Sequence, residues 1–288
     1  MRTPAGCAPR RRLPACGSAC TCPSSATRCR GPCSPPPARD AEDAGADDLW
    51  VSDHVLMPIG SERPPAVFHD ALTTLTWAAA ATRRAGLGTS VLVAPYRHPL
   101  LLAKALASLD ALSGGRVVCG LASGWMASEF AALGVPFGER GRRTDETIAA
   151  MRALWRGEPA FRWRGATVEG HRLLPPPARP GGPPLWIGGD SDAGVACAAR
   201  AGDAWHTTTW RPEKLAPRLR ALDAALQAAG RRRGDLLVSV RVRADVAAVR
   251  DLAPRLAALG VDHLLVDPPA LRPERLGDEV AELRRITA

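Results

Sequence analysis

The chain has 288 residues, of which 46% are hydrophobic and 23% are charged, and its formal net charge is +9. A chain of this length can bury a large core in one or two domains, and no apolar run reaches the roughly 18 residues that a membrane-spanning helix requires. This composition predicts a globular protein without a membrane span, and we expect it in the cytoplasm.

The positive charge is concentrated near the N-terminus. Residues 1–38 contain six arginines and no acidic residue, whereas the rest of the chain carries 32 basic and 29 acidic side chains and is close to neutral. Proteins that bind nucleic acids typically carry a basic stripe interleaved with aromatic residues, and the sequence has none. We therefore expect no nucleic-acid partner.

The cysteines follow the same distribution. Six of the eight lie within the first 33 residues, at Cys7, Cys16, Cys20, Cys22, Cys29 and Cys33. Their irregular spacing, with no nearby histidine and few hydrophobic residues, argues against a zinc module or a disulfide knot, and we expect no metal site. The other two, Cys119 and Cys197, lie in apolar stretches and are predicted to be buried and reduced.

Residues 1–37 form an anomalous Pro/Cys/Arg-rich segment with two open explanations. It is either a disordered tail or the product of an out-of-frame or misplaced start in GC-rich DNA, and it has no apolar region typical of a secretory signal. From Ala38 the sequence becomes ordinary, so we assign residues 38–288 to one domain. Mass spectrometry of the native N-terminus separates the two explanations.

The body of the chain alternates between predicted strands and helices. Residues 38–48 read as the end of a helix that Gly45 stops. There follow a strand at 48–54, a helix at 68–84, a strand at 87–95, a helix at 99–112, a strand at 117–124 and a helix at 140–156. The loop at 161–184 is rich in prolines, which forbid continuous regular structure there.

The same alternation resumes after this loop. The predicted elements are a strand at 184–189, a helix at 192–202, a strand at 204–209, a helix at 212–229, a strand at 236–243, a helix at 245–259, a strand at 261–269 and a helix at 272–286. Strands that alternate with helices pair in parallel, because parallel neighbours need a crossover. Seven repeats favour an α/β fold of the TIM (β/α)8-barrel type over an open doubly wound sheet.

A normal first strand is absent from this pattern. It should lie where residues 1–37 now stand, and we expect the barrel to lack it, which would expose the edges of two neighbouring strands.

Polar residues end the first visible strand, at the position where a barrel of this type carries its active site. Asp53 and His54 follow the apolar segment that contains Trp50. A histidine exchanges a proton near neutral pH, so His54 is a candidate acid–base residue; the alternative is a hydrogen-bonded structural histidine.

Small residues mark two further strand ends. The stretch GTSV at 88–91 contains Ser90 and Val91, and GLASGW at 120–125 ends in Gly124 and Trp125. Small side chains beside an aromatic one suit a planar ring that lies against the main chain. The alternatives are an ordinary strand for the first stretch and an ordinary core position for Trp125.

A glycine pair follows another strand in WIGGDSDAG, residues 186–194. Gly188 and Gly189 precede a helix that Ser191 is placed to cap, and such a turn is receptive to phosphate. The negative charges of Asp190 and Asp192 mildly disfavour an anion bound directly above them. The sequence has no nucleophile elbow, zinc-protease motif, Walker loop or dinucleotide-binding glycine motif.

Taken in order, several of these strings resemble the bacterial luciferase-like monooxygenase family, especially its branch that uses the deazaflavin coenzyme F420. The matching strings span residues 38 to about 210 and are DDLWVSDHV, GTSVLVAPYRHPLLLAKALASLDALSGGRVVCGLASGW, EFAALGVPFGERGRRTDE, LWIGGDS and AARAGDAWH. The resemblance implies a barrel that binds a flavin or deazaflavin at its mouth, often as a homodimer.

The resemblance also implies roles for single residues. It places a non-prolyl cis peptide at Ser90–Val91, and it places Asp53 and His54 beside the ring, with His54 in proton transfer or coenzyme contact. The expected cofactor-binding residues are Asp53, Ser90, Val91, Gly124, Trp125, Gly188, Gly189 and Ser191, of which Gly188, Gly189 and Ser191 would hold the phosphate.

The expected activity is hydride exchange between F420 and an unidentified small organic substrate. An FMN-dependent luciferase-like monooxygenase is one alternative, and an inactive or truncated barrel that only binds ligand is another. Trp125 stands where the sugar-phosphate dehydrogenases of the family carry a glutamate, which disfavours that substrate. Glu129, one helical turn later, is not expected to replace that glutamate.

Overall fold

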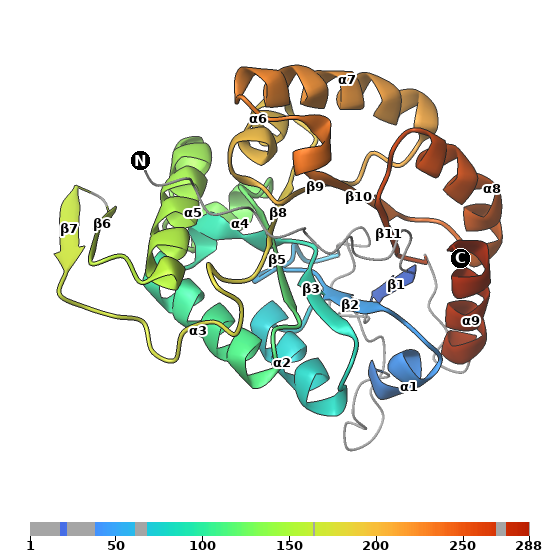
Figure 1. Cartoon of the computed structure of the whole chain (residues 1–288), viewed down its shortest axis with the longest axis horizontal. Helices are drawn as coiled ribbons and strands as arrows, with labels where there is room; N and C mark the ends of the chain where they lie inside the picture. Colours follow the sequence, from blue (N-terminus) through green and yellow to red (C-terminus); the bar gives the residue numbers. More distant parts are fainter. Residues whose placement is uncertain (1–17, 22–37, 61–67, 164, 269–274, 288) are drawn as a thin grey trace, which may run out of the picture.

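The computed structural model describes residues 18–21, 38–60, 68–163, 165–268 and 275–287. Parallel strands form a central sheet in the order β3-β2-β1-β11-β10-β9-β8-β5-β4, and β3 also pairs with β5. This last pairing joins the two ends of the sheet, so the strands close into a barrel (Figure 1). The predicted TIM-barrel fold is confirmed.

Apart from β1, the strands of the barrel correspond to the predicted ones, and the strand predicted at 87–95 is divided into β3 and β4. They are β1 (Ser18–Thr21), β2 (Asp48–Val51), β3 (Gly86–Thr89), β4 (Leu92–Val93), β5 (Val117–Ala122), β8 (Leu185–Gly188), β9 (Ala204–Thr207), β10 (Leu237–Val242) and β11 (His263–Val266).

Helices surround these strands, as Figure 1 shows. They are α1 (Ala38–Asp43), α2 (Ala71–Ala81), α3 (Pro99–Leu112), α4 (Ala127–Ala132), α5 (Arg140–Arg156), α6 (Asp192–Ala201), α7 (Pro212–Ala228), α8 (Val246–Ala258) and α9 (Leu276–Thr287). The bounds of α3 and α5 are those predicted from the sequence. The short helix α4 was not predicted, and it carries a residue of the candidate site.

The prediction that the barrel lacks its first strand is wrong. The backbone of β1 pairs in parallel with both β2 and β11, where Ala19 faces Asp48 on one side and Leu265 on the other. The segment SACT has no alternating apolar pattern, so this strand, whose place is set by backbone pairing, could not be recognised from its residues. The rest of residues 1–37, including the origin proposed for them, lies outside the described residues.

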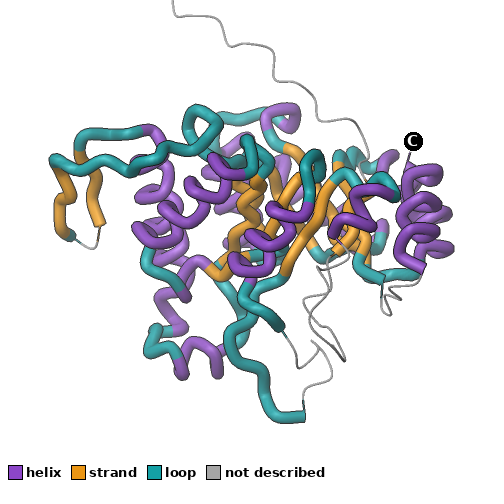
Figure 2. Tube along the Cα trace, turned by 90° about the horizontal axis from the view of Figure 1, so that it is seen from below, coloured by secondary structure: helices purple, strands orange, loops and turns teal. Residues whose placement is uncertain are grey.

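The prediction of an irregular loop at 161–184 is wrong for its first part. An antiparallel hairpin of β6 (Ala160–Trp163) and β7 (Ala166–Glu169) stands there, and both views show it projecting from the barrel (Figures 1 and 2). The prolines at 175–177 follow the hairpin, so they interrupt regular structure only after it. Trp163 contacts the His98 ring edge-on, with a centroid separation of 5.7 Å.

The barrel interior is filled by the protein's own aromatic side chains. Trp50 and Trp186 are buried, with ring centroids 4.9 Å apart. A Cβ atom on Gly88 would lie 2.3 Å from the Trp50 ring, so this glycine in the GTSV stretch makes room for Trp50.

The two cysteines of the barrel behave as predicted. Cys119 and Cys197 are free and buried, and burial raises the pKa of the Cys119 thiol to about 12. Across the described residues, no helix is both long enough and apolar enough to cross a bilayer.

Glu42 of α1 ties the turn between α2 and β3 to the barrel. Its carboxylate accepts hydrogen bonds from the successive backbone N–H groups of Arg83, Arg84 and Ala85, at 3.0, 2.6 and 2.7 Å. Burial opposes the charge, but the hydrogen bonds from Ala85, Arg84 and Arg83 and the charge of Arg84 outweigh it and lower the pKa of Glu42 below 4.5. Glu42 is therefore a carboxylate that the fold stabilises in its charged form.

Replacing Glu42 by glutamine should lower the free energy of unfolding by about 1–2 kcal/mol at neutral pH, because charge-assisted hydrogen bonds become neutral ones. A carboxylate with a lowered pKa stabilises the fold fully above its unfolded value, and this contribution disappears as pH falls through the folded value. The difference between wild type and Glu42→Gln in urea unfolding should therefore shrink below pH 4.5. Asp43→Asn, an exposed neighbour, is the control, and an equal loss there would contradict the assignment.

Candidate functional site

All the predicted site residues follow strands at the same end of the barrel. Asp53 and His54 follow β2, Ser90 and Val91 follow β3, Gly124 and Trp125 follow β5, and Gly188, Gly189 and Ser191 end or follow β8. Because these strands pair in parallel, their carboxyl ends face the same way. The structure thus places every predicted residue at one mouth.

His54 is held by a buried carboxylate from α4. Its Nδ1 lies 3.0 Å from Oε2 of Glu129, whose side chain is 1% exposed. Oε1 of Glu129 accepts the backbone N–H groups of Val55 and Leu56 at 2.6 and 3.1 Å, and the Tyr96 hydroxyl donates to Oε2 at 3.0 Å. Glu129 therefore fixes both the His54 ring and the chain that follows it.

The electrostatics of this cluster define its protonation. Burial opposes the Glu129 charge, but the hydrogen bonds from His54, Leu56 and Val55 together lower the pKa of Glu129, so it is ionised at neutral pH. A carboxylate only accepts, so a neutral His54 carries its proton on Nδ1 and leaves a lone pair on Nε2. Burial and the charge of Glu129 raise the pKa of Tyr96, which keeps its hydroxyl a donor.

Aromatic rings border His54. The Phe68 ring lies 4.7 Å from it and the Trp125 ring meets it edge-on at 6.0 Å. Trp125 is 64% exposed, which rules out the alternative that it is an ordinary core residue. His54 itself has a side chain that is 12% exposed, so it is reachable beside an apolar wall.

Asp53 is bonded to groups of the protein itself, and its predicted place beside the coenzyme ring stays a prediction. Its buried carboxylate accepts from Nη1 and Nη2 of Arg97, at 2.5 and 2.8 Å, and from the backbone N–H of Val93 at 2.9 Å. These partners occupy both oxygens, so Asp53 fixes the chain between β2 and α3.

The predicted cis peptide at Ser90–Val91 is present. The Ser90 carbonyl accepts from Arg241 Nη1 at 2.9 Å and from the Ser52 hydroxyl at 3.2 Å. Arg241 in turn pairs with Asp267 at 2.6 Å. The strand ends of β2, β3, β10 and β11 therefore meet around the Ser90 backbone.

Packing inside the protein explains two of the predicted glycines. A Cβ atom on Gly124, whose φ is +80°, would lie 2.6 Å from Val93 Cγ1, and one on Gly188 would lie 3.0 Å from Val91 Cγ1. A side chain at Gly124 would clash with Val93, and one at Gly188 would crowd Val91. The predicted contacts of Gly124 with a planar ring and of Gly188 with a phosphate stay predictions.

The turn after β8 has the features of an anion site. Ser191 caps α6 by accepting the N–H of Gly194 at 3.2 Å, and Arg218 of α7 donates from Nη1 to Asp192 at 2.8 Å. The Nε and Nη2 groups of Arg218 are buried without acceptors among the described residues. Unsatisfied guanidinium groups close to a helix N-terminus fit a phosphate or other anionic group. Asp190 is bonded to the Thr207 and Thr208 hydroxyls.

Sequence reasoning missed three residues of this mouth. Glu129 was considered only as a replacement for the glutamate of the sugar-phosphate dehydrogenases, and Arg97 was not considered. Their contacts with His54 and Asp53 join residues far apart in the sequence. Arg241 did leave a signal, since a charged residue inside the apolar strand at 237–242 marks a side chain at a barrel mouth or interior.

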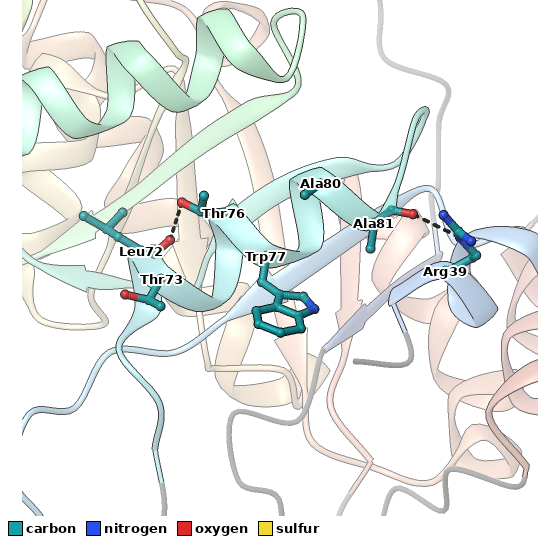
Figure 3. A pocket seen from close by; sticks show the side chains of 7 residues that line it. All are labelled: Arg39, Leu72, Thr73, Thr76, Trp77, Ala80 and Ala81. Carbon is teal, nitrogen blue, oxygen red and sulfur yellow. Dashed lines mark hydrogen bonds between the residues drawn. The ribbon is translucent and has the colours of Figure 1, made fainter. Parts of the chain in front are cut away.

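A separate groove runs along the outer face of α2 (Figure 3). Trp77 borders it, and Arg39 of α1 donates to the Ala81 carbonyl at 3.4 Å at its end. It contains none of the predicted site residues, so we place the candidate active site at the carboxyl ends of the strands.

Sequence comparison identifies relatives over most of the chain. An uncharacterised protein of Mycobacterium tuberculosis is 33% identical over 259 residues, which cover 85% of this chain and 88% of the relative. An F420-dependent glucose-6-phosphate dehydrogenase of Beutenbergia cavernae is 37% identical over 188 residues, which cover 61% of this chain but only 52% of the relative.

Solved structures share the fold. An F420-dependent secondary alcohol dehydrogenase in complex with an F420–acetone adduct superposes with a TM-score of 0.73, at 20% identity, over 87% of this chain and 93% of that one. A riboflavin lyase with modified FMN and riboflavin gives a TM-score of 0.71, at 17% identity, over 86% and 83%. The family model of the luciferase-like monooxygenases matches residues 37–283, and the chain therefore belongs to that family.

Proposed function

We propose that this chain catalyses hydride exchange between coenzyme F420 and a small organic substrate, with His54 giving or taking a proton. Family membership makes the chain an oxidoreductase. The observation that carries the proposal is His54: Glu129 holds its Nδ1 at 3.0 Å, and its Nε2 has no hydrogen-bond partner within the described part of the chain. A histidine fixed in one tautomer beside an open mouth is suited to acid–base catalysis.

The mouth offers groups that fit such a coenzyme. Arg218 and the capped start of α6 would hold its anionic tail, and the exposed Trp125 would border its tricyclic ring. When bound, the deazaflavin supplies the carbon that accepts or releases hydride. The chain's own residues orient the ring, keep water from the reacting face and move the proton at His54 Nε2.

FMN is the second candidate coenzyme. It also combines a tricyclic ring with a phosphate, and a solved neighbour carries a modified FMN. The relatives that favour F420 include a glucose-6-phosphate dehydrogenase. In this chain, however, Trp125 stands where the resemblance places the glutamate of the sugar-phosphate dehydrogenases. We therefore propose a small substrate other than a sugar phosphate.

Titration of the purified protein with F420 and with FMN, followed by fluorescence, tests the coenzyme. We expect F420 to bind more tightly, and Arg218→Gln to weaken its binding about tenfold, because an arginine–anion hydrogen bond contributes on the order of 1.4 kcal/mol. Arg220→Gln, an exposed arginine on the same helix, should leave the affinity unchanged. Retention of FMN with no binding of F420 would overturn the choice of coenzyme.

We also propose a cytoplasmic location, which fits two cysteines, Cys119 and Cys197, that form no disulfide. The homodimer that the resemblance implies stays a prediction.

A further inference from the structure

Four polar side chains form a continuous chain through the barrel interior. Ser90 Oγ lies 2.8 Å from His206 Nε2, His206 Nδ1 lies 2.8 Å from Ser239 Oγ, and Ser239 Oγ lies 2.8 Å from His263 Nδ1. All four residues are at most 7% exposed, and they come from the β3 end, β9, β10 and β11. A buried polar chain of this length needs an explanation beyond packing.

Opposite charges stand at its two ends. At the mouth, Nη1 of Arg241 lies 3.3 Å from Ser90 Oγ. At the other end, the buried Nε2 of His263 lies 3.4 Å from Oδ2 of Asp48, which is an ion-pair distance without hydrogen-bond geometry. His263 and Asp48 are the first residues of β11 and β2. The series of hydrogen bonds therefore runs from the carboxyl end of the barrel to the amino end.

The charges of Arg241 and Asp48 favour one direction of donation along this series of hydrogen bonds. The two hydrogens of Arg241 Nη1 are shared among the Ser90 carbonyl at 2.9 Å, the Ser52 hydroxyl at 3.0 Å and Ser90 Oγ at 3.3 Å. The positive charge of Arg241 favours a Ser90 hydroxyl whose own proton points away, to His206 Nε2. Neutral His206 must then donate from Nδ1 to Ser239, whose hydroxyl donates to His263 Nδ1. This leaves the His263 proton on Nε2, which faces the carboxylate of Asp48.

The surroundings keep His206 neutral and cover the imidazoles of the hydrogen-bonded series with aromatic rings. Burial is the main cause that lowers the pKa of His206 to about 3, and the charge of Arg241, with that of His263 whenever it is protonated, acts in the same direction. The Trp50 ring stacks on His206 at 5.6 Å with an interplanar angle of 7°, and Trp186 meets His263 edge-on at 4.9 Å. These indole rings cover the imidazoles and leave the neighbouring hydroxyls as their hydrogen-bond partners.

We infer that Ser90 is a further proton-accepting residue of the mouth, and that the interior chain carries the proton it receives toward Asp48. This inference rests on the proposed function for the ligand, which would be a bound ring or substrate with an N–H or O–H group. When that group gives its proton to Ser90 Oγ, the Ser90 proton passes to His206 Nε2 and the Nδ1 proton of His206 passes to Ser239. The Ser239 proton then passes to His263 Nδ1, and the Nε2 proton of His263 passes to Asp48. Each member loses one proton and gains one, and the charge changes only at the donor and at Asp48.

The first experiment needs no ligand. Long-range proton–nitrogen NMR spectra of the labelled full chain near neutral pH report which nitrogen of each histidine carries the proton. We expect His206 protonated on Nδ1 and His263 on Nε2 alone. A His206 proton on Nε2, or a doubly protonated His263, would reverse the chain and overturn the inference.

Variants and a probe then test the connection. Ser90→Ala, which removes the hydroxyl that donates to Nε2, should abolish the Nδ1 preference of His206. Thr89→Val, which removes a buried hydroxyl bonded to the Gly120 carbonyl, should preserve it. Reduced F420 should shift the nitrogen signals of both His54 and His206 in wild type, and only those of His54 in Ser90→Ala. A shift at His54 without one at His206 in wild type overturns the relay. No shift at either residue counts against the proposed function, and the ligand-free spectra then decide the direction of the chain.

Discussion

Glu129→Gln should disable the acid–base group of the mouth and lower the free energy of unfolding by about 2–3 kcal/mol, because hydrogen bonds to a charged acceptor are each worth roughly 1.5–3 kcal/mol. The amide oxygen can still accept the N–H groups of Val55 and Leu56, which bond to Oε1. The amide nitrogen, however, would face His54 Nδ1 and the Tyr96 hydroxyl, which both bond to Oε2. It would donate to His54 and drive the ring proton to Nε2, which removes the lone pair that the mechanism needs. Turnover should fall about 100-fold, in line with the worth of a positioned acid–base residue.

The alkaline titration of Tyr96 reports the loss of the Glu129 charge directly, because the chain has one tyrosine. Burial and the charge of Glu129 raise its pKa above the ordinary 10.0, so alkaline titration of tyrosinate absorbance should begin at lower pH in Glu129→Gln than in wild type. Glu279→Gln in α9 is the control and should leave the titration unchanged. An unchanged Tyr96 titration in Glu129→Gln would show that the Glu129 charge does not govern this cluster.

Arg97→Ala should lower the free energy of unfolding by about 3–5 kcal/mol, because it leaves the buried Asp53 carboxylate without its counter-charge. The side chain of Asp53 is 1% exposed and that of Arg97 is 18% exposed, so water screens this pair poorly. Urea unfolding monitored by tryptophan fluorescence measures the loss.

Two comparisons isolate the charge from the packing. Asp53→Asn combined with Arg97→Ala should recover part of the loss, since no uncompensated charge is then buried. Arg142→Ala removes a guanidinium that is 57% exposed and paired with Glu146, and it should cost at most about 1 kcal/mol. Equal losses in Arg97→Ala and Arg142→Ala would refute the importance of burial here.

The fold was predictable from the sequence wherever apolar patterning and helix ends coincide. The helices at 99–112 and 140–156 have the predicted bounds, because Pro99 begins the first and Gly157, with φ +67°, ends the second. The strand β1 was not predictable, because its four residues carry no pattern and pairing with β2 and β11 alone places them.

The site was predictable in position but less so in detail. The polar residues at the ends of strands pointed to the mouth, and His54 lies there. The partners of these residues could not be inferred, because Glu129, Arg97 and Arg241 reach them across the fold. The sequence indicates the hydrogen-bonded series of the barrel interior only weakly. His206 and Ser239 are polar residues within apolar strands, and the alternation of side chains along a strand directs them into the barrel.

The seam between β1 and β11, where Ser18 faces Leu264, also constrains how the protein matures. Translation delivers β1 and β11 at widely separated times, so β1 has one unpaired edge while the intervening residues emerge. Contacts so distant along the chain form slowly, and exposed strand edges recruit other chains. We therefore expect the nascent polypeptide to be prone to aggregation until its last strand leaves the ribosome.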